Sequence, residues 1–581
     1  MENKAFGIDL GTTYSCISYV DDINGEPVVV DNVEGMNVTP SVVYFEDEDS
    51  ITVGDVAKES AIMSPENTCE FVKRKMGVDK VAITIGDKEY SPEQISALIL
   101  QKLVRDAEAA LDTKIKDVVI TCPAYFGIAE RTATENAGKI AGLNVLEIIN
   151  EPTAAALCYG SLRGVEDKVI LVYDLGGGTF DVTIIRVTPD EIVAIATDGN
   201  HQLGGKNWDE AFMEYLEDQF RTMKDFDDEF DLEAIQELQL KAEKAKQQLT
   251  AKDKTKVIVQ ASGVKASIEV TREAFDEITS SLLRQTIDRT NDAIKAAADK
   301  GVTKIDEIIL VGGSCKMPQV MAAVSAEYPN IPIKMFEPNE AVAKGAALHA
   351  NSLQKGQAEL QKWVEMIIDK TGIDVTKVGD GDIDELKEKI NKDEDIKEVI
   401  KEIAEEKGVD TEEIIAVIGG TKSNSKSGKV LRNITSKSFG IEVLVPQMVD
   451  GKREYTEKIS NLVTKQDAVP VKITKEFGTA SDNQENVEIK VYETDVTERV
   501  YDIGGFEPLG VAVLDLPPNL PEGAPIEITI ELTTDNLLKL RGFEKTSNNE
   551  INAKLIPSTN VILTEEEVEE QKNQLTGLTF V

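Results

Sequence analysis

Residues 169–187 read Val-Ile-Leu-Val-Tyr-Asp-Leu-Gly-Gly-Gly-Thr-Phe-Asp-Val-Thr-Ile-Ile-Arg-Val, with the first aspartate at Asp174. An apolar run ends at an aspartate, a glycine-rich bend follows, and a second apolar run returns. This pattern predicts a β-hairpin with a polar turn. Residues 5–20 repeat the design around Asp9. Two such units in one chain indicate two similar halves that face each other.

The two bends carry the residue types that the phosphates of a nucleotide need. Only glycine lets backbone N–H groups approach a phosphate closely, and threonine hydroxyls add donors. Asp9 and Asp174, at strand ends, supply carboxylates that can hold hydrated Mg²⁺. Either bend alone is more often an ordinary glycine hairpin. The pair, with Gly312-Gly313-Ser314 after a predicted strand at 305–311, favours a nucleotide site.

Strands and helices alternate up to about residue 350, which favours an α/β fold. Helices are predicted at 91–111, 233–250 and 340–350. Residues 354–428 differ, because amphipathic helical spacing among acidic and basic residues ends in a linker rich in glycine, serine and lysine.

Residues 430–560 alternate apolar and polar side chains between turn signals, which predicts a small antiparallel β-sandwich. A last helix is predicted after Thr564, with that threonine as N-cap and Glu567 at the third position. We therefore expect four parts: a nucleotide-binding domain at 1–353, an acidic helical insertion and linker at 354–428, a β-sandwich at 429–563 and a short helix at 564–581.

Composition excludes several classes of function. The 581 residues suffice for several domains, and 105 acidic against 63 basic residues give a net charge of −42. Such a charge repels nucleic acid and anionic lipid, so neither is expected as a partner, although acidity also simply favours solubility. Two histidines make a histidine metal site or a Ser-His-Asp triad improbable. Five cysteines without a CxxC pair, and the lack of an apolar leader or span, predict a cytoplasmic chain.

In this order, the motifs resemble those of the Hsp70 (DnaK-type) chaperones, within the actin-like ATPase superfamily. The resemblance covers residues 5–350 and 430–570. The matching segments are Gly-Ile-Asp9-Leu-Gly-Thr-Thr-Tyr14-Ser, Lys73-Arg74, Thr-Cys-Pro123-Ala-Tyr-Phe, Asn150-Glu151-Pro-Thr-Ala-Ala-Ala, Asp174-Leu-Gly-Gly-Gly-Thr-Phe-Asp181, Leu203-Gly204-Gly205, Leu310-Val-Gly-Gly-Ser314 and Glu340-Ala-Val-Ala. It implies an α/β actin-like two-lobed ATPase domain, followed by the short helical insertion and an all-β antiparallel sandwich.

The resemblance also implies the roles of single residues toward ATP or ADP, Mg²⁺ and K⁺. The catalytic set is Asp9, Lys73, Glu151, Asp174 and Thr179, and the carboxylates for the cations are Asp9, Asp174 and Asp181. The nucleotide-binding set is Gly11, Thr12, Thr13, Tyr14, Gly176, Gly177, Gly178, Gly205, Glu243, Lys246, Thr250, Gly312, Gly313, Ser314, Lys316 and Asn339. Lys73 would stabilise charge on the transferred phosphoryl group. Without the resemblance, Lys73 is a surface lysine and the helix face with Glu243 and Lys246 is a solvated charge stripe.

The chain departs from the family near the adenine. Gln247 and Lys316 stand where the family usually has arginines that sandwich the base, and Asn339 replaces an aspartate. Residues 204–209 read Gly-Gly-Lys-Asn-Trp-Asp in place of Gly-Gly-Glu-Asp-Phe-Asp. Neither glutamine nor lysine stacks as an arginine does. We expect altered, weaker nucleotide affinity with hydrolysis retained.

The β-region resembles the peptide-binding sandwich of the family, most closely over residues 477–491. The implied apolar groove is formed by Ile441, Leu444, Phe477, Ala480, Val487 and Ile489. Any one of these is equally expected as a plain core residue. Pro123 and Arg131 match positions that pass on the nucleotide state. The interdomain linker at 430–434 is altered, and the family's helical lid is missing beyond its first turns.

We therefore expect an ATP-dependent Hsp70-type chaperone, a slow ATPase that binds exposed hydrophobic segments of client proteins. A J-domain co-chaperone and a nucleotide exchange factor are implied partners. Two alternatives remain: a nucleotide-gated scaffold for one dedicated protein, and an actin-like or sugar-kinase-type ATPase. The sandwich at 429–563 argues against the second.

Overall fold

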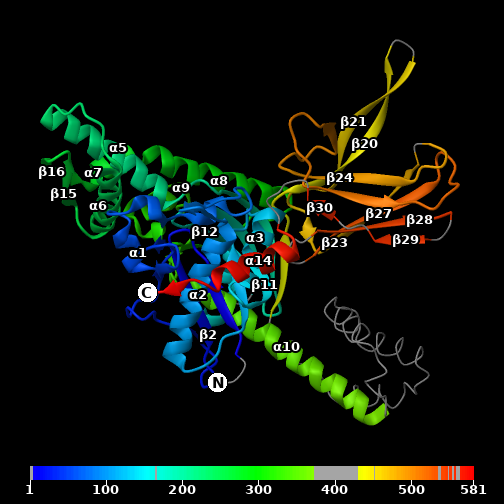
Figure 1. Ribbon diagram of the computed structural model, residues 1–581, viewed down its shortest axis with the longest axis horizontal. Helices are drawn as coiled ribbons and strands as arrows, with labels where there is room; N and C mark the ends of the chain where they lie inside the picture. Colours follow the sequence, from blue (N-terminus) through cyan, green and yellow to red (C-terminus); the bar gives the residue numbers. More distant parts are fainter. Residues whose placement is uncertain are drawn as a thin grey trace.

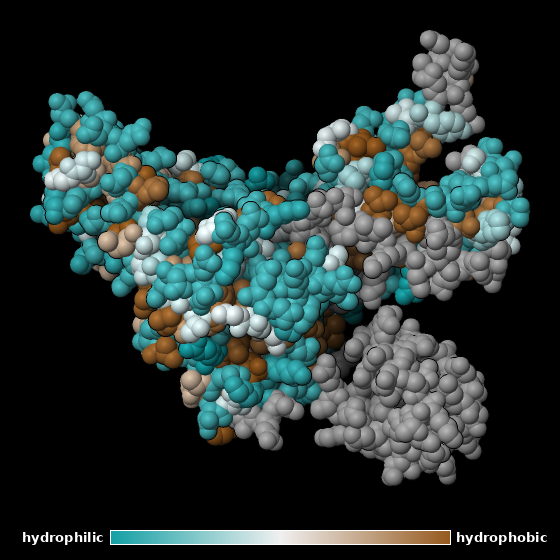
Figure 2. Space-filling view, viewed as in Figure 1, coloured by the Kyte–Doolittle hydropathy of each residue, from teal (hydrophilic) through white to brown (hydrophobic). Residues whose placement is uncertain are grey.

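The computed structural model describes residues 4–163, 167–371, 429–449, 452–479, 481–533, 538–546, 549–552, 555–557 and 563–581. They form two α/β lobes and a β-sandwich that lies against both lobes (Figure 1). Hydrophilic side chains cover most of the described surface on the face shown in Figure 2, in keeping with the acidic composition. Among the described residues, no helix is long and apolar enough to cross a bilayer.

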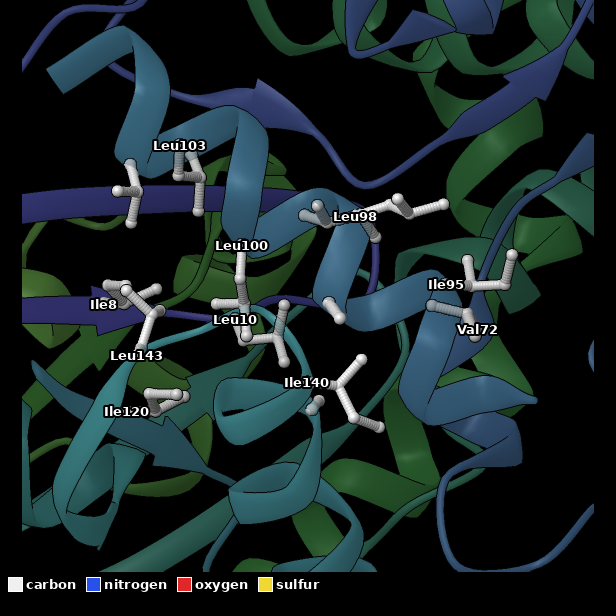
Figure 3. Close-up of a cluster of buried hydrophobic side chains, with 14 of the residues drawn as sticks. Ile8, Leu10, Val72, Ile95, Leu98, Leu100, Leu103, Ile120, Ile140 and Leu143 are labelled. Carbon is white, nitrogen blue, oxygen red and sulfur yellow. The ribbon is translucent and has the colours of Figure 1, made fainter. Parts of the chain in front are cut away.

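Lobe I is built on a mixed sheet with the order β11-β10-β1-β2-β3. The strands are β1 (Phe6–Asp9), β2 (Tyr14–Val20), β3 (Pro27–Val29), β10 (Asp117–Cys122) and β11 (Asn144–Asn150). Two helices, α2 (Pro92–Leu111) and α3 (Ile128–Ile140), pack on this sheet. Figure 3 shows Leu98 and Leu100 of α2 above Ile8 and Ile120 of the strands, all fully buried. The helix predicted at 91–111 is confirmed by the bounds of α2. It begins after Ser91 because Ser91 and Gln94 form a capping box there.

Lobe II is built on a sheet with the order β18-β17-β12-β13-β14-β19-β22. The strands of the lobe itself are β12 (Lys168–Leu175), β13 (Phe180–Val187), β14 (Glu191–Asn200), β17 (Glu307–Val311) and β18 (Ile333–Met335). Its helices include α5 (Gly205–Lys224), α6 (Leu232–Ala251), α8 (Ser280–Asp299) and α9 (Pro318–Glu327). Both predicted hairpins are confirmed: β1 pairs antiparallel with β2, and β12 with β13, where Asp174 lies opposite Asp181.

Two helices, α4 (Glu151–Arg163) and α10 (Ala341–Thr371), pack between the sheets of the lobes. They approach closely, since a Cβ on Gly345 would lie 1.8 Å from the carbonyl oxygen of Ala154. The small-residue helix predicted at 340–350 is confirmed, but it is longer. The expected domain boundary at 353/354 falls inside α10, so this helix of the lobes runs on into the expected insertion. The rest of that insertion and its linker lie outside the described residues.

The sandwich consists of two antiparallel sheets, as predicted. One contains β25 (Val500–Asp502), β21 (Lys452–Val463), β20 (Ser438–Val449), β24 (Asn486–Thr494), β26 (Gly510–Asp515) and β30 (Leu555–Pro557). The other contains β23 (Val471–Gly478), β27 (Pro525–Leu532), β28 (Leu538–Glu544) and β29 (Asn549–Asn552). The segment before the sandwich forms β19 (Val430–Ile434), which pairs in parallel with β14 and antiparallel with β22 (Ala468–Val469). The sandwich thus continues the sheet of lobe II.

The last described segment forms α14 (Glu565–Leu575) and β31 (Thr579–Phe580). The predicted cap is confirmed. The Thr564 side chain accepts a hydrogen bond from the Glu567 amide, and the Glu567 carboxylate accepts one from the Thr564 amide. The segment lies on lobe I and not over the sandwich (Figure 1).

Candidate functional site

A cavity of about 480 Å³ lies between the lobes, within the size range of small-molecule sites. It takes lining residues from both hairpins, from α6 and from the turn after β17. The predicted residues that line it are Asp9, Gly11, Thr12, Thr13, Tyr14, Lys73, Glu151, Asp174, Gly176, Gly177, Thr179, Gly205, Glu243, Lys246, Thr250, Gly312, Gly313, Ser314, Lys316 and Asn339. Gly178 and Asp181 lie behind this lining.

The two glycine-threonine bends touch across the cleft. A Cβ on Gly177 would lie 1.9 Å from Oγ1 of Thr13, and one on Gly178 would lie 2.3 Å from Cγ2 of Thr12. Any side chain at these glycines would force the lobes apart. The bends therefore need glycine for the approach of the lobes as well as for room beside a phosphate.

Lys73 lies at the floor of the cavity, at what we call the phosphate end, defined by Asp9, Lys73, Glu151, Asp174 and Asp181. It comes from a single turn of 3₁₀ helix, and Glu151 is the first residue of α4. The Lys73 Nζ and Glu151 Oε1 atoms are 2.5 Å apart, with side chains 5% and 9% exposed. Lys73 is thus not the surface lysine that its basic neighbours suggest, but a buried cation aimed at carboxylates.

The phosphate end holds more acid than base. Burial raises the pKa of Asp9 to about 7, with the Glu151 charge acting in the same direction and Lys73 against it. Burial and Glu151 likewise raise the pKa of Asp181 to about 8, and that of Asp174 well above its ordinary value. Four carboxyl groups, three of them buried and that of Asp9 partly exposed, face one ammonium group, so the site favours protons or cations.

The residues present fit a hydrated Mg²⁺ ion better than an ion held by protein alone. Among the described residues, no three His, Cys, Asp or Glu side chains are grouped so as to hold a metal. Mg²⁺ usually keeps several waters and shares phosphate oxygens, so it needs only one or two carboxylates. Asp181 Oδ1 is buried and finds no hydrogen-bond partner in the described part of the chain, which leaves an acceptor open for a cation.

The opposite end of the cavity, which we call the base end, is defined by Tyr14, Lys58, Asp209, Glu243 and Lys246. Glu243 of α6 bonds Lys58 Nζ of α1 (Asp55–Ser60) at 2.6 Å and the Tyr14 hydroxyl at 3.1 Å. This triad joins the two lobes. Lys246 pairs with Asp209 at 2.7 Å, and burial raises the pKa of Asp209 to about 6 against the Lys246 charge. Lys58 was missed because nothing in its sequence neighbourhood marks it.

Three of the expected departures from the family pattern lie on the wall of the cavity. Gln247, Lys316 and Asn339 line the cavity, and the first two are exposed. Gln247 Nε2 donates weakly to Glu243 Oε1 at 3.4 Å. All three are therefore free to contact a base, without the planar cations that would stack on it.

In the sandwich, four predicted groove residues come together and one does not. Ile441, Phe477, Val487 and Ile489 belong to one apolar cluster, and of these four Phe477 and Val487 are partly exposed. Leu444 does not belong to this cluster: it is 55% exposed and lies on the opposite face of β20 from Ile441. The reason is that β20 continues as a regular strand to Val449, so alternation turns position 444 away. Val443 packs on the cluster instead, and Ala480 lies outside the described residues.

Helix α3 of lobe I begins inside the sandwich interface. Ile128, its first residue, is buried in an apolar cluster with Phe439 and Val463 of the sandwich. Glu493 Oε1 accepts from the Ile128 amide at 3.1 Å, a carboxylate at a helix N-terminus. Burial raises the pKa of Glu493 to about 7, and the Glu130 charge adds to this. Tyr125 nearby donates to Asp495 at 3.1 Å.

The two predicted relay positions lie between this interface and the phosphate end. Arg131 of α3 donates to the Phe126 carbonyl at 3.1 Å and to the side chain of Asn150, the residue before Glu151. The Pro123 carbonyl accepts from the Phe126 amide at 3.2 Å. A continuous set of contacts thus runs from the floor of the cavity to the first turn of α3.

Known proteins resemble this chain over most of its length. A family model described as Hsp70 protein matches residues 5–377 and 389–577. The chain is 36% identical over 550 residues to the chaperone protein DnaK of Thermotoga neapolitana. The aligned region covers 92% of this chain and 78% of that protein. The same protein of Thermotoga petrophila and of Thermotoga maritima is 37% identical with the same coverage.

Proposed function

The chain belongs to the Hsp70 family, and on this premise we propose how its parts divide the work of an ATP-dependent chaperone. It is an ATP hydrolase and a chaperone of the DnaK type, in a family that binds ATP or ADP with Mg²⁺. We assign the nucleotide to the 480 Å³ cavity, with its phosphates at the phosphate end. The fit of hydroxyl groups, glycines, one buried lysine and unpaired carboxylates supports this assignment.

The buried side chains at the phosphate end supply most of the catalysis. Mg²⁺, when bound beside Asp9 and Asp174, supplies neutralisation of the phosphate charge, and K⁺ suits the open acceptor of Asp181. Lys73 donates to the phosphoryl oxygens as negative charge develops on them. Glu151 holds the ammonium group in place, 2.5 Å away. Burial excludes bulk water, which strengthens each of these interactions.

We propose that the sandwich binds extended apolar segments of client proteins beside the cluster of Ile441, Phe477, Val487 and Ile489. One observation supports control by nucleotide above all others. Ile128, in the sandwich interface, and Arg131, which bonds the residue beside Glu151, are on the same first turn of α3. A shift of Glu151 on ATP binding therefore moves α3, whose first residue is packed against the sandwich.

The decisive test is whether ATP and peptide change each other's binding, since coupling free energy is reciprocal. We expect ATP to speed release of a fluorescent apolar peptide and lower its affinity, and peptide to lower the affinity for ATP by the same factor as ATP lowers the affinity for peptide. Arg131→Ala should remove the effect of ATP on release and leave hydrolysis within about threefold, because Arg131 does not line the cavity. Arg284→Ala, an exposed arginine of α8, is the matched control. Independent binding of the two ligands to the unaltered chain would overturn the proposal.

We propose further that bound peptide is held by the sandwich alone. Within the described residues, the helix that follows the sandwich lies on lobe I, so no described helix covers the apolar cluster. Release should therefore be fast with ADP as well as with ATP, which stopped-flow fluorescence measures. ADP-state release as slow as that of a relative with a helical lid would contradict this.

The remaining partners and location follow the family. We propose a J-domain co-chaperone, an exchange factor and a reducing, cytoplasmic setting, in which the five free and buried cysteines stay reduced. A peptide array separates a general chaperone from a scaffold for one protein: many apolar peptides should bind, and a single binding sequence would favour the scaffold.

A further inference from the structure

One stretch of the cavity wall is built by lobe II from side chains that can donate hydrogen bonds. We call it the donor wall and define it by three residues that line the cavity: Gln247 of α6, Lys316 at the end of the 3₁₀ turn Gly313–Lys316, and Asn339 shortly before α10. All three carry N–H groups, and the two carboxamides also carry an oxygen acceptor. None of the three is a carboxylate, which can only accept when it is ionised.

Helix α6 and the turn that carries Lys316 approach each other over the start of α5. A Cβ on Gly205 would lie 2.5 Å from Ser314 Oγ and 3.3 Å from Lys246 Nζ. Ser314 is two residues before Lys316, and Lys246 is next to Gln247 in the chain. Gln247 and Lys316 therefore lie on neighbouring elements. Both are exposed, which leaves the outer side of the donor wall open to solvent.

Asn339 lies beside the glycine turn that opens the same 3₁₀ segment. The Gly312 amide donates to the Pro338 carbonyl at 3.0 Å, and a Cβ on Gly313 would lie 3.4 Å from Asn339 Oδ1. The Asn339 carboxamide makes no hydrogen bond to another residue in the described part of the chain. Its donor and its acceptor are therefore both available to a ligand in the cavity.

Lobe I contributes an apolar loop beside the donor wall. Asn37 Nδ2 donates to Glu340 Oε1 at 2.5 Å, which ties this loop to the residue after Asn339. The neighbours of Asn37, Met36 and Val38, line the cavity. A planar ring meets thioether and aliphatic carbon on this side, and such contacts do not depend on the groups at the edge of the ring. Selection among bases therefore falls to the donor wall.

The donor wall bears on the one position at which the two common purines carry opposite groups. Adenine has an amino donor at carbon 6, where guanine has an oxygen acceptor, and both have an acceptor at N7. The aspartate that Asn339 replaces would offer only acceptors, which suit the amino group alone. The Asn339 carboxamide can turn to meet either group, and a lysine such as Lys316 donates to the oxygen or to N7. The wall thus lacks the acceptor-only side chain that rejects a 6-oxo group.

We propose that the cavity accepts 6-oxopurine nucleotides, those of guanine and hypoxanthine, with an affinity within about tenfold of that for ADP. This inference rests on the proposed assignment of the nucleotide to this cavity. A site gains discrimination from a mismatched hydrogen bond, and that gain is lost when one carboxamide satisfies both partners. The exposed side of the wall at Gln247 and Lys316 leaves space for the 2-amino group of guanine. Guanine nucleotides then join adenine nucleotides as ligands that set the state of the sandwich.

Isothermal titration of the full chain with the Mg²⁺ complexes of ADP, IDP and GDP tests this. In the unaltered chain, the dissociation constants of IDP and GDP should lie within about tenfold of that of ADP. IDP carries the 6-oxo group without the 2-amino group, so it separates the two contributions. Asn339→Asp should raise the ratio of the IDP constant to the ADP constant by about tenfold or more, because the carboxylate brings no donor to the oxygen. Asn330→Asp adds the same charge at an exposed position outside the cavity, and as the matched control it should leave the ratio unchanged.

Two results would overturn the inference. One is an IDP constant more than about tenfold above that of ADP in the unaltered chain. The other is an unchanged ratio in a folded Asn339→Asp variant. Excess GDP should also displace bound ADP, and GDP that binds without displacing ADP contradicts the inference as well. If ADP itself does not bind, the proposed function fails, whereas a chain that binds ADP and rejects IDP and GDP overturns this inference alone.

Discussion

The two ends of the cavity between the lobes are built on opposite electrostatic principles. The phosphate end places Asp9, Glu151, Asp174 and Asp181 around the single ammonium group of Lys73, and all of them are buried except Asp9, which is partly exposed. The base end sets two lysines, Lys58 and Lys246, against two acids, Glu243 and Asp209, in direct pairs at 2.6 and 2.7 Å. One end has an excess of negative charge and the other is balanced.

This difference bears on the three cavity positions, Gln247, Lys316 and Asn339, at which departures from the family are expected from the sequence. A balanced end is satisfied without a ligand, so its rim at Gln247, Lys316 and Asn339 can change without leaving a buried charge unpaired. At the phosphate end, replacing any of the five defining residues by a neutral one would alter the balance of charge. None of Gln247, Lys316 and Asn339 belongs to the set of charged residues that defines the phosphate end.

Removing one lysine from each end of the cavity should have the largest effects and should separate catalysis of hydrolysis from nucleotide binding. We expect Lys73→Ala to lower single-turnover ATP hydrolysis by about 100-fold or more, because it removes charge stabilisation in the transition state. Lys246→Ala should instead weaken ATP binding, by about tenfold, and leave the chemical step nearly unchanged. Rapid-quench kinetics and equilibrium titration measure the two quantities. Near-normal turnover in purified, folded Lys73→Ala would invalidate the assignment of the phosphate end.

Acidity should stabilise the nucleotide-free chain through the phosphate end. Asp9 and Asp181 have an ordinary pKa of 3.8, and the fold raises these values to about 7 and about 8. The folded state therefore favours the protonated groups, and their contribution is complete below about pH 4 and lost progressively as pH rises through 7 and 8. Between pH 5.5 and pH 8, with chelator present, the free energy of unfolding should fall by at least about 1.4 kcal/mol, the equivalent of one pKa unit.

Thermal unfolding of Asp181→Asn supplies the control for this pH dependence. Asparagine is neutral at every pH, so between pH 5.5 and pH 8 the stability of the variant should fall less than that of the unaltered chain. The Mg²⁺ complex of ADP should also reduce the fall, because it stabilises the charged carboxylates. If the stability of Asp181→Asn falls as much as that of the unaltered chain, the pH dependence arises from groups elsewhere in this acidic protein.

Restoring arginine at the rim should have the smallest effect. Gln247→Arg combined with Lys316→Arg should tighten ADP binding by about threefold to tenfold, since planar cations can then stack on the base. Turnover should stay the same, because the phosphate end is untouched. Isothermal titration measures the affinity. Lys244→Arg, an exposed change on the same helix, serves as the reference and should leave affinity unaltered.

Much of this arrangement was predictable because it is local. The two hairpins, the capping boxes of α2 and α14 and the alternation in the sandwich each depend on residues a few positions apart. The carboxylates at strand ends were found for the same reason. Lys58 was not, since its partner Glu243 is 185 residues away. Leu444 lies three positions after Ile441 in β20, so strand alternation turns it to the other face, which the motif alone did not indicate.

The amino-acid order alone specifies which residue types occur at each turn, strand end and helix cap, because these choices follow from backbone geometry within a few residues. It thereby specifies an α/β nucleotide-binding part, a β-sandwich and the family. Long-range packing decides the rest. It buries Lys73 against Glu151, balances the base end, inserts Ile128 into the sandwich interface and lays β31 on β6 (Ser50–Val53). Charges and strand edges act on whatever lies nearest in space, and only the fold determines what that is.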